Sequence, residues 1–443
     1  MHASLLAYAE RQAPRYTSYP TAPHFNAGIG DALVRAWLAA IPVDGRLSLY
    51  LHVPYCRQLC WYCGCNTYAA RRDEPVLDFV DAVLEEINLV SGSLRARAVS
   101  EIHWGGGTPN ILTPEQFTRI AEHLALRFNT GALALHAIEL DPRYVDAAKA
   151  RVYVQAGVNR VSLGVQDLNP SVQQAIGRVQ PLEVVERAVE TLRSAGIGRI
   201  NMDLMYGLPH QTLEHLRDSV GFAAAMRPDR VALFGYAHVP WFKKRQRLIP
   251  EAALPGPAER FEQAEAARTE FEALGYVAIG LDHFALPGDE LAIAAQEGRL
   301  RRSFQGYVVE QAAALIGFGP SAISTLPQGY AQNASEPGGW AQSVRDGKLA
   351  IARGHALSGD DRVRRRLIEQ IMCNFEGDLG PLGGAEACAN ELAALAPMFA
   401  DEMIELAHDR LILSAAARPF CRLVGLAFDL YAQRGMARHS RAV

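Results

Sequence analysis

Residues 47–65 read LSLYLHVPYCRQLCWYCGC, an apolar strand-like run from Leu47 to Val53 followed by four cysteines within ten residues. The first three, Cys56, Cys60 and Cys63, have the spacing C-x3-C-x2-C. Three thiolates from one short loop can each ligate one iron of a [4Fe–4S] cluster and leave the fourth iron without a protein ligand. Such an iron can bind a small molecule and pass an electron to it, so we interpret this loop as a reaction centre.

Two other interpretations of the cysteines fit less well. A structural zinc site commonly takes two separated ligand pairs, but Cys63 and Cys65 are one residue apart and the sequence has no second C-x2-C or H-x3-H pair. Seven cysteines in 443 residues are sparse and odd in number, which does not suit a disulfide framework. The remaining cysteines are predicted to be small buried hydrophobic residues: Cys373, Cys388 and Cys421.

The composition is that of an ordinary globular enzyme, with 49% hydrophobic and 21% charged residues and a net charge of −4. This charge predicts no bulk attraction to nucleic acid or to an anionic membrane. No apolar run approaches the roughly 20 residues needed to span a bilayer, and the N-terminus does not have the pattern of a signal peptide. We therefore expect a cytoplasmic protein, and nothing in the sequence calls for more than a monomer.

The fold is indicated by a repeated alternation of short apolar strands and amphipathic helices between residues 46 and 285. Several of the helices begin with a proline in the first turn, where proline is favoured. Repeated βα units predict an α/β fold with a parallel sheet, here a partial (β/α)6-type barrel. The expected strands are Leu47–Val53, Glu101–Trp104, Leu135–Leu140, Arg160–Val165, Ile200–Met205, Arg230–Tyr236 and Val277–Leu281.

Polar and glycine-rich segments lie at the ends of these strands, and in parallel α/β folds that edge carries the active site. The cysteine loop follows the first strand and Gly105–Pro109 follows the second; the others are Glu139–Pro142, Gln166-Asp167, Asp203 and Tyr236–His238.

Four regions are expected along the chain. Residues 1–45 form an N-terminal segment that covers the substrate, 46–285 the barrel, and 286–355 a connecting or lid-like region. Residues 356–443 form a small helical, winged-helix-like domain with helices over Asp360–Phe375 and Glu386–Ala407, followed by a short hairpin-like stretch at Arg410–Leu413. Winged helices often bind DNA, but the acidic balance argues against that role here.

With these motifs in place, the chain resembles the radical S-adenosylmethionine (SAM) enzymes. More closely, it is similar to the oxygen-independent coproporphyrinogen III oxidases of haem biosynthesis. The resemblance covers nearly the whole chain, and the N-terminal segment and the extra Gly64-Cys65 are its specific signs. The matching segments are PRYTSYPTA (14–22), YLHVPYC (50–56), CWYCGCN (60–66), HWGGGTP (103–109), VQD (165–167), DLMYGLP (203–209), YAHVP (236–240) and YAQN (330–333).

The resemblance implies that the first three cysteines hold one [4Fe–4S] cluster whose open iron is chelated by a SAM molecule. Residues matching contacts to this first SAM are Tyr50, Gly106, Glu139 and Ile323. Tyr50 and Cys65 are the catalytic candidates. Cys65 matches a cysteine that is not a ligand, and its thiol either relays a proton or electron or is structural; Tyr50 could instead be a core residue.

The resemblance also implies a second SAM, and the matching positions are Tyr62, Gly107, Thr108, Gln166, Arg178, Asp203 and Ala237. The glycines offer bare backbone that can approach a ligand closely. Arg178, interpreted as lying on a helix, could equally be a solvated surface charge. Asp203 is expected to be buried and therefore to need a partner.

The implied reaction is the oxidative decarboxylation of two propionates of coproporphyrinogen III to vinyl groups, giving protoporphyrinogen IX, with hydrogen abstraction by a 5′-deoxyadenosyl radical. The implied partners are this tetrapyrrole and an unidentified low-potential electron donor, and Arg15 is expected to pair with a propionate. The segment 308–314 departs from the family, since apolar residues replace polar ones there. Three rival functions stay open: a haem chaperone, a radical enzyme for a different tetrapyrrole, and a redox-sensing DNA-binding regulator.

Overall fold

The computed structural model describes residues 3–309 and 312–432, which fall into two compact units. The first, the sheet unit, comprises Phe25–Asp203 and Ala312–Ala356; the second, the C-terminal unit, comprises Met1–His24, Leu204–Gln311 and Leu357–Val443. Within the described ranges, no helix combines the length and the apolar character needed to cross a bilayer.

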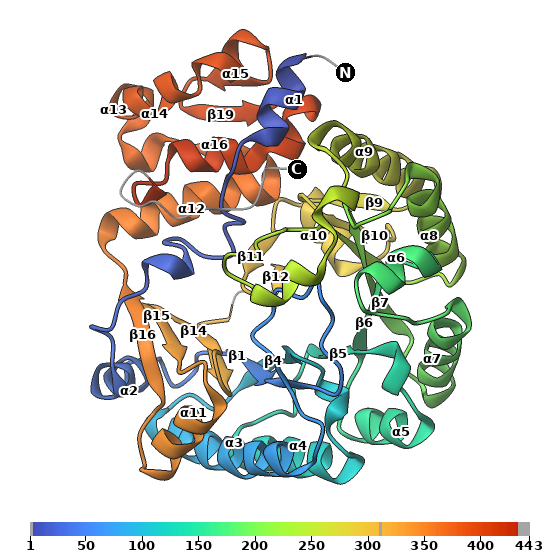
Figure 1. Cartoon of the computed structure of the whole chain (residues 1–443). Coiled ribbons are helices and arrows are strands. Elements are labelled where there is room, and N and C mark those ends of the chain that lie inside the picture. The colour runs from blue at the N-terminus through green and yellow to red at the C-terminus, as the bar shows by residue number, and fades with distance from the viewer. Residues whose placement is uncertain (1–2, 310–311, 433–443) are drawn as a thin grey trace. The chain divides into compact units, whose positions relative to one another are not determined.

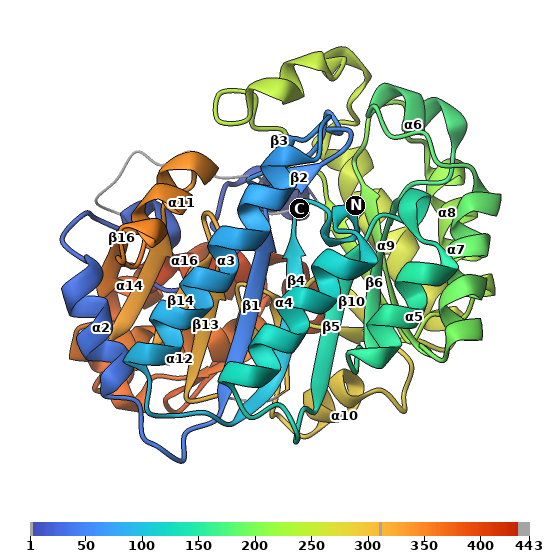
Figure 2. The same ribbon diagram turned by 90° about the horizontal axis from the view of Figure 1, so that it is seen from below.

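The sheet unit is built on parallel strands. Strands β1 (Leu47–Val53), β4 (Val99–Gly106), β5 (Leu135–Leu140), β6 (Arg160–Gln166) and β7 (Arg199–Tyr206) are neighbours in that order. On its other side, β1 pairs in parallel with β13 (Ala314–Phe318). The helices α3 (Glu74–Ser93), α4 (Pro114–Arg127), α5 (Ala147–Gln155) and α7 (Leu182–Ala195) lie along the outer face of these strands (Figures 1 and 2). The predicted α/β fold with a parallel sheet is confirmed.

Local sequence explains why these helices begin where they do. The Thr113 hydroxyl caps α4 by accepting from the Gln116 backbone N–H, and the Gln116 side chain accepts from the Thr113 backbone N–H in return. Pro114 occupies the first turn, where a backbone donor is not needed. The buried side chains Phe117, Ile120 and Leu124 recur at the helical period and pack the helix onto the sheet.

Residues 312–356 extend the sheet, whereas the sequence suggested a connecting or lid-like region from 286 to 355. Strands β14 (Ile323–Leu326), β15 (Gly329–Asn333) and β16 (Ile351–Ala356) follow β13 in antiparallel pairing, with α11 (Pro337–Arg345) before the last of them. These strands are short and mix apolar residues with glycine and polar residues, so their pairing partners rather than their own propensity decide their conformation. Of the apolar segment 308–314, residues 310 and 311 lie outside the described residues.

One buried carboxyl ties α3 to this extension of the sheet. Glu86 is 2% exposed and accepts hydrogen bonds from the Gly319 N–H (2.6 Å), Asn333 Nδ2 (2.7 Å) and Trp340 Nε1 (3.1 Å). Burial is the largest influence and raises the pKa of Glu86 to about 7, although these three donors act in the opposite direction.

The raised pKa of Glu86 predicts a pH-dependent stability. Because its folded-state pKa lies above the ordinary value of 4.5, its stabilising contribution is complete below pH 4.5 and is lost as the pH rises through 7. Relative to Glu86→Gln, the wild-type free energy of unfolding should fall by about 3 kcal/mol over that interval. Urea denaturation at several pH values measures this difference. Glu85→Gln, an exposed change on the same helix, should follow the wild type, and a pH-independent difference for Glu86→Gln would contradict the assignment.

Two sets of antiparallel strands lie in the C-terminal unit. In the first, β8 (Arg230–Gly235), β10 (His283–Ala285) and β9 (Val277–Ile279) pair antiparallel in that order, and α8 (Leu213–Ala225) packs on α9 (Pro257–Ala273). In the second, β17 (Glu376–Asp378), β19 (Arg410–Leu413) and β18 (Ile404–Ala407) pair antiparallel. The other elements are α1 (Ala3–Glu10), α10 (Glu290–Gln296), the hairpin β11 (Arg301–Ser303) and β12 (Gly306–Val308), α12 (Gly359–Asn374) and α16 (Cys421–Ala427).

The predicted helix over Glu386–Ala407 is wrong. The segment instead forms three short helices, α13 (Gly384–Ala387), α14 (Ala389–Ala394) and α15 (Ala396–Ala400), and then β18. Pro397 lies in the first turn of α15, which favours a new helix start there. The pairing of β18 with β19 then removes Ile404–Ala407 from the helical pattern. The small helical C-terminal region itself, with its antiparallel strands, is as expected.

Candidate functional site

The cysteine loop is fixed at both ends and in its middle. Strand β2 (Tyr55–Cys56) pairs in parallel with β3 (Tyr68–Ala69), so the chain returns to its starting point after the cysteines. In the middle, the Trp61 backbone N–H donates to the Ile176 carbonyl oxygen at 2.9 Å. A side chain at Gly177 would meet the Trp61 ring at 2.9 Å, so the indole lies directly against this backbone.

Each of the three predicted ligand cysteines has a polar neighbour at its sulfur. The Cys56 Sγ lies 3.2 Å from Thr67 Oγ1 and 3.1 Å from Thr108 Oγ1. The Cys60 Sγ accepts from Arg178 Nη1 at 3.5 Å, and the Cys63 Sγ accepts from the Cys65 backbone N–H at 3.4 Å. Burial raises the pKa of the Cys56 thiol, although both threonine hydroxyls lower it, so a bound metal would have to displace its proton.

The cysteine loop supplies thiol donors of the kind that an iron–sulfur cluster takes. Across residues 3–309 and 312–432, no group of three His, Cys, Asp or Glu side chains is arranged to hold one metal ion. In a cubane cluster each cysteine would bind a different iron, so the three thiols need not converge on one point. All the cysteines have free thiols, and hydrogen-bond donors at the sulfurs favour their thiolate form.

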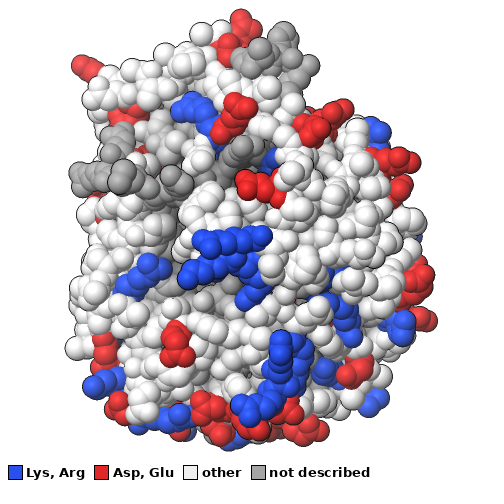
Figure 3. Space-filling view, viewed as in Figure 1, with Lys and Arg blue, Asp and Glu red and all other residues white. Residues whose placement is uncertain are grey.

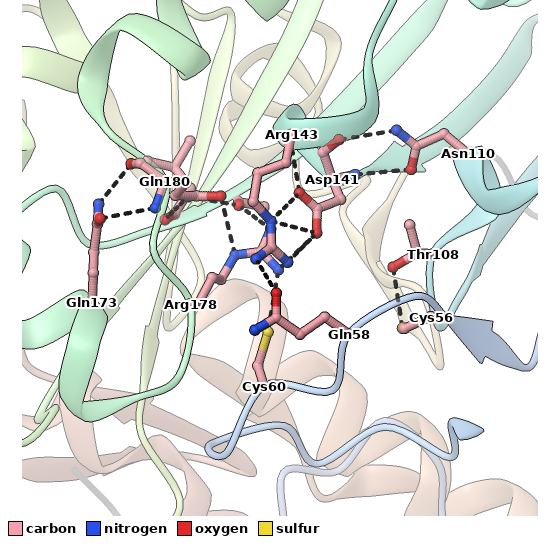
Figure 4. Close-up of polar contacts among 12 residues, drawn as sticks. Cys56, Gln58, Cys60, Thr108, Asn110, Asp141, Arg143, Gln173, Arg178 and Gln180 are labelled. Atoms are coloured by element: carbon pink, nitrogen blue, oxygen red, sulfur yellow. Dashed lines mark hydrogen bonds and ion pairs between the residues drawn. The ribbon is translucent and has the colours of Figure 1, made fainter. Parts of the chain in front are cut away.

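Arg178 connects the cysteine loop to the carboxyl ends of the sheet strands (Figure 4). Its Nη1 lies 3.1 Å from Asp141 Oδ2 besides contacting Cys60, and its Nη2 donates to the Gly164 carbonyl oxygen at 2.7 Å. Its Nε donates to Gln180 Oε1 at 3.2 Å. The guanidinium therefore contacts a thiol, a carboxylate, a carbonyl and an amide, and its position is determined by all four.

The interpretation of Arg178 as a helical and possibly solvated residue is corrected by this geometry. Arg178 lies in the loop between α6 (Pro170–Ala175) and α7, and it is 7% exposed. The proline at position 181, directly before α7, sets the start of that helix and leaves residues 176–180 outside it. A charge this buried needs partners, which Asp141 and Cys60 provide.

Asp141 is the acidic centre of this network (Figure 4). Arg143 approaches it from a second side, with Nη2 2.7 Å from Asp141 Oδ2. The Asn110 side chain exchanges two hydrogen bonds with the Asp141 backbone, at 2.9 and 3.2 Å. Burial would raise the pKa of Asp141, but Arg178 and then Arg143 outweigh it and hold the pKa below its usual range.

A second polar group joins the ends of β1, β4 and β5. Glu139 Oε1 lies 3.0 Å from His103 Nε2, and its Oε2 accepts from the Gly106 backbone N–H at 3.3 Å. The Tyr50 ring stacks on His103 with centroids 5.9 Å apart, and its hydroxyl lies 3.3 Å from His52 Nδ1. Tyr50 is thus part of a polar group at the strand ends rather than an isolated core residue.

The glycines at the end of β4 and directly after it are required by close packing. A Cβ on Gly105 would lie 2.9 Å from the Glu139 carboxylate, and one on Gly106 would lie 2.7 Å from the His52 ring. Gly106 also has φ +105, which residues with a side chain rarely adopt. A Cβ on Gly107 would lie 2.6 Å from the Tyr55 carbonyl oxygen, so the loop and the cysteine strand are in direct backbone contact.

The remaining predicted residues of the sheet unit lie at the end of β6, within β7 and in the cysteine loop. Gln166 ends β6 with φ +70, a left-handed conformation. Asp203, on β7, accepts from Ser162 Oγ (2.9 Å) and Asn201 Nδ2 (2.8 Å). The Asp203 side chain is half-buried, whereas the sequence predicted it to be buried. Side chains along β7 alternate between a half-buried face, which carries Asp203, and a buried apolar face. Tyr62 is half-buried in the cysteine loop beside Arg178, whose charge lowers the tyrosine pKa while burial raises it more.

The last two predicted residues, Ile323 and Ala237, lie on other elements of the chain. Ile323 begins β14, and a Cβ on Gly317 would lie 3.0 Å from its backbone; Gly317 is the β13 partner of Tyr50, so Ile323 belongs to this group. Ala237 lies in the C-terminal unit just after β8, where its carbonyl oxygen accepts from Gln246 Nε2 at 3.1 Å.

Sequence reasoning missed several polar residues that complete the site. His52 and His103 were quoted only as parts of motifs, yet they link Tyr50 to Glu139. Their position offered a signal, because His52 is two residues after Tyr50 and shares its face of the strand. Arg178 and the segment containing Asp141 were singled out from the sequence, but their contact with each other and with Cys60 was not, because Arg178 is distant from both in sequence.

Comparison with known proteins identifies relatives over nearly the full length. The family model described as the radical SAM superfamily matches residues 50–223. An oxygen-independent coproporphyrinogen III oxidase of Bradyrhizobium diazoefficiens is 46% identical over 99% of both chains. One from Escherichia coli (strain K12) is 37% identical, covering 97% of this chain and 96% of the relative. The solved structure of coproporphyrinogen III oxidase from Escherichia coli, titled a radical SAM enzyme, matches with a TM-score of 0.89 and 35% identity, covering 95% of this chain and 100% of that one.

Proposed function

Because this chain belongs to the oxygen-independent coproporphyrinogen III oxidase family of radical SAM enzymes, we propose that it converts two propionate side chains of coproporphyrinogen III to vinyl groups in haem biosynthesis. Each conversion of a propionate carboxylate removes carbon dioxide, one hydrogen atom from the β-carbon and one electron. The observation that carries the proposal is the meeting of the three-cysteine loop with Arg178, Tyr50 and Glu139 at one edge of the parallel sheet.

Membership of this family implies an iron–sulfur cluster and SAM. We propose that Cys56, Cys60 and Cys63 hold a single [4Fe–4S] cluster. Such a cluster, when bound with SAM and reduced, supplies a carbon-centred radical that can remove hydrogen from an unactivated carbon. The chain's own residues hold the sulfurs: Thr67 and Thr108 at Cys56, and Arg178 at Cys60. Cys65, whose backbone N–H donates to the Cys63 sulfur, supports the loop in addition to offering a thiol.

Tyr50, Gly106, Glu139 and Ile323 are the proposed contacts of the SAM that chelates the cluster. The Glu139 carboxylate has 43% of its side chain exposed and holds one oxygen on His103, so it can still accept hydrogen bonds from ribose hydroxyls. His52 contacts the Tyr50 hydroxyl. His103 stacks on the Tyr50 ring and lies at hydrogen-bond distance from Glu139, so the two histidines position both residues. A merely packed tyrosine would not need this polar support.

The proposed second SAM would meet Tyr62, Gly107, Thr108, Gln166, Arg178, Asp203 and Ala237. Two of these carry further roles that affect the proposal. Thr108 already contacts the Cys56 sulfur, and Arg178 already contacts Cys60 and Asp141. Asp203, whose carboxylate accepts hydrogen bonds from Ser162 and Asn201, is the proposed acidic contact of this second molecule. The structure thus favours a role of Arg178 in holding the cysteine loop over a role in binding the second SAM.

The anionic tetrapyrrole needs cationic partners, and the C-terminal unit offers a pair. The Arg302 Nε donates to the Arg15 carbonyl oxygen at 3.3 Å, and the Arg302 guanidinium stacks 4.5 Å from the Tyr307 ring centroid. Among the described residues neither Arg15 nor Arg302 has a carboxylate at ion-pair distance, and Arg302 Nη1 is buried without a hydrogen-bond partner. We propose that Arg15, as the sequence suggested, pairs with a propionate, and that Arg302 assists it.

An anaerobic assay tests the proposed function. Reconstituted protein is incubated with SAM, dithionite as a substitute for the unidentified electron donor, and coproporphyrinogen III, and the products are analysed by mass spectrometry. We expect 5′-deoxyadenosine together with a doubly decarboxylated tetrapyrrole. Formation of 5′-deoxyadenosine with an unaltered tetrapyrrole would reject this substrate while retaining the radical chemistry. Tight haem binding without turnover would indicate a haem chaperone instead.

A further inference from the structure

The segment between β8 and the helical turn at Glu251–Ala253 has an unusual composition. Residues 241–248 read WFKKRQRL and bring Lys243, Lys244, Arg245 and Arg247 within five residues. No acidic residue occurs between positions 237 and 250, although the whole chain has a net charge of −4. Figure 3 shows lysine and arginine side chains gathered over this part of the C-terminal unit, which Figure 1 draws in yellow-green. We call residues 241–248 the basic loop.

The basic loop also exposes large apolar side chains. Phe242 is 73% exposed, Leu248 58% and Trp241 49%. Single exposed apolar residues are ordinary on protein surfaces, but three of this size among four cations form a distinct patch. The Lys243 ammonium lies 5.1 Å from the Phe242 ring centroid, so charge and aromatic surface are presented together.

The conformation of the basic loop is fixed from inside by a buried amide. Gln246 is 1% exposed; its Oε1 accepts from the Val239 N–H at 2.6 Å and its Nε2 donates to the Ala237 carbonyl oxygen at 3.1 Å. Ile249, 4% exposed, anchors the end of the loop. With Gln246 and Ile249 inward, the neighbouring aromatic and cationic side chains are held outward rather than left to collapse onto the surface.

Three of the four cations in the basic loop have no internal ion-pair partner among the described residues. In the described part of the chain, Lys244, Arg245 and Arg247 have no carboxylate at ion-pair distance. Uncompensated cations mixed with exposed Trp, Phe and Leu are typical of segments that lie in the interface of an anionic bilayer. Protein-docking surfaces, in contrast, are depleted of lysine relative to other surface.

We propose that the basic loop docks this protein on the surface of an anionic lipid bilayer, with Trp241, Phe242 and Leu248 entering the headgroup region and the four cations meeting lipid phosphates. This departs from the expectation drawn from net charge, which averages over the whole chain. A rationale that rests on the proposed function is that the product keeps two of four carboxylates and is therefore more apolar than the substrate. Docking would let that product pass to the lipid phase.

Vesicle co-sedimentation tests the proposal without any turnover, so its result is independent of the proposed function. The full chain is mixed with vesicles of phosphatidylcholine alone or with about one-third phosphatidylglycerol. We expect binding only to the anionic vesicles, weakened by high salt. The double variant K244Q/R247Q should bind at least about tenfold more weakly, since each cation near such a surface contributes roughly fivefold. W241S/F242S should weaken binding at both salt concentrations.

The matched control is R187Q/R217Q, which removes the same charge from exposed positions on α7 and α8. It should bind anionic vesicles as the wild type does. Equal weakening of the control and the loop variant, or no binding by the wild type, would overturn the proposal. The proposal would also be overturned, in favour of a protein-docking surface, if the wild type bound a polyacidic protein but no vesicles and K244Q/R247Q bound neither.

Discussion

Cys60→Ala is expected to abolish both the iron–sulfur cluster and tetrapyrrole turnover. Cys60 is the most buried of the three proposed ligands, at 6% exposure, and its sulfur is the one that Arg178 contacts. With two cysteines left in the loop, a cubane would lack protein ligands on two irons and would be lost. Iron and sulfide analysis of reconstituted protein, with its visible absorption spectrum, measures the cluster, and 5′-deoxyadenosine formation measures the activity.

The control for this variant is Cys388→Ala. Cys388 is equally buried, at 2% exposure, but lies at the start of α14 in the C-terminal unit. It should retain the cluster and activity and lose only the small packing contribution of one sulfur. If Cys60→Ala still cleaved SAM reductively, Cys60 would not be a ligand.

Arg178→Gln is expected to lower tetrapyrrole turnover by about 10- to 100-fold, as for other residues that support metal ligands. The change removes a cationic donor from the Cys60 sulfur and the bridge from that sulfur to Asp141. Hydrogen bonds to cluster sulfurs raise the reduction potential, so the variant's cluster should have a more negative potential. Spectroscopic redox titration measures the potential, and thermal unfolding measures the stability separately.

Arg143→Gln provides the comparison. Arg143 also pairs with Asp141, through Nη2 at 2.7 Å, but its side-chain hydrogen bonds run to Asp141 and Gln58 rather than to a cysteine sulfur. The Arg143→Gln variant should therefore remove a cationic partner of Asp141 without a comparable change in the reduction potential of the cluster. Equal shifts of potential in both variants would show that Arg178 acts through Asp141 alone and not through its contact with Cys60.

The parallel strands of the sheet were predictable because each of them has a recognisable apolar segment in the sequence. The strand predicted at Leu47–Val53 and that at Leu135–Leu140 have the observed bounds, and the residues that follow them, Pro54 and Asp141, mark where the apolar runs end. The clustering of polar residues at one edge followed from parallel strand direction alone. Strands β14–β16 were not predicted, because their stability comes from pairing with neighbours rather than from their own composition.

The candidate site was predictable where residues are close in sequence and not where folding brings them together. The cysteine spacing identified the loop, and the glycine run identified the backbone approach that Gly106 and Gly107 show. The contact between Arg178 and Cys60 spans 118 residues, and no local pattern encodes it. Burial of a charge depends on the tertiary partner, so Arg178 could not be separated from a surface arginine by sequence alone.

The most direct test of the central claim traces the hydrogen atom that leaves the propionate β-carbon. Coproporphyrinogen III deuterated at the β-carbons of its propionates is incubated anaerobically with reconstituted protein, SAM and dithionite, and the 5′-deoxyadenosine is analysed by mass spectrometry. We predict that deuterium appears in 5′-deoxyadenosine in step with vinyl formation. Decarboxylated tetrapyrrole with deuterium-free 5′-deoxyadenosine would contradict hydrogen abstraction from the propionate and with it the proposed reaction.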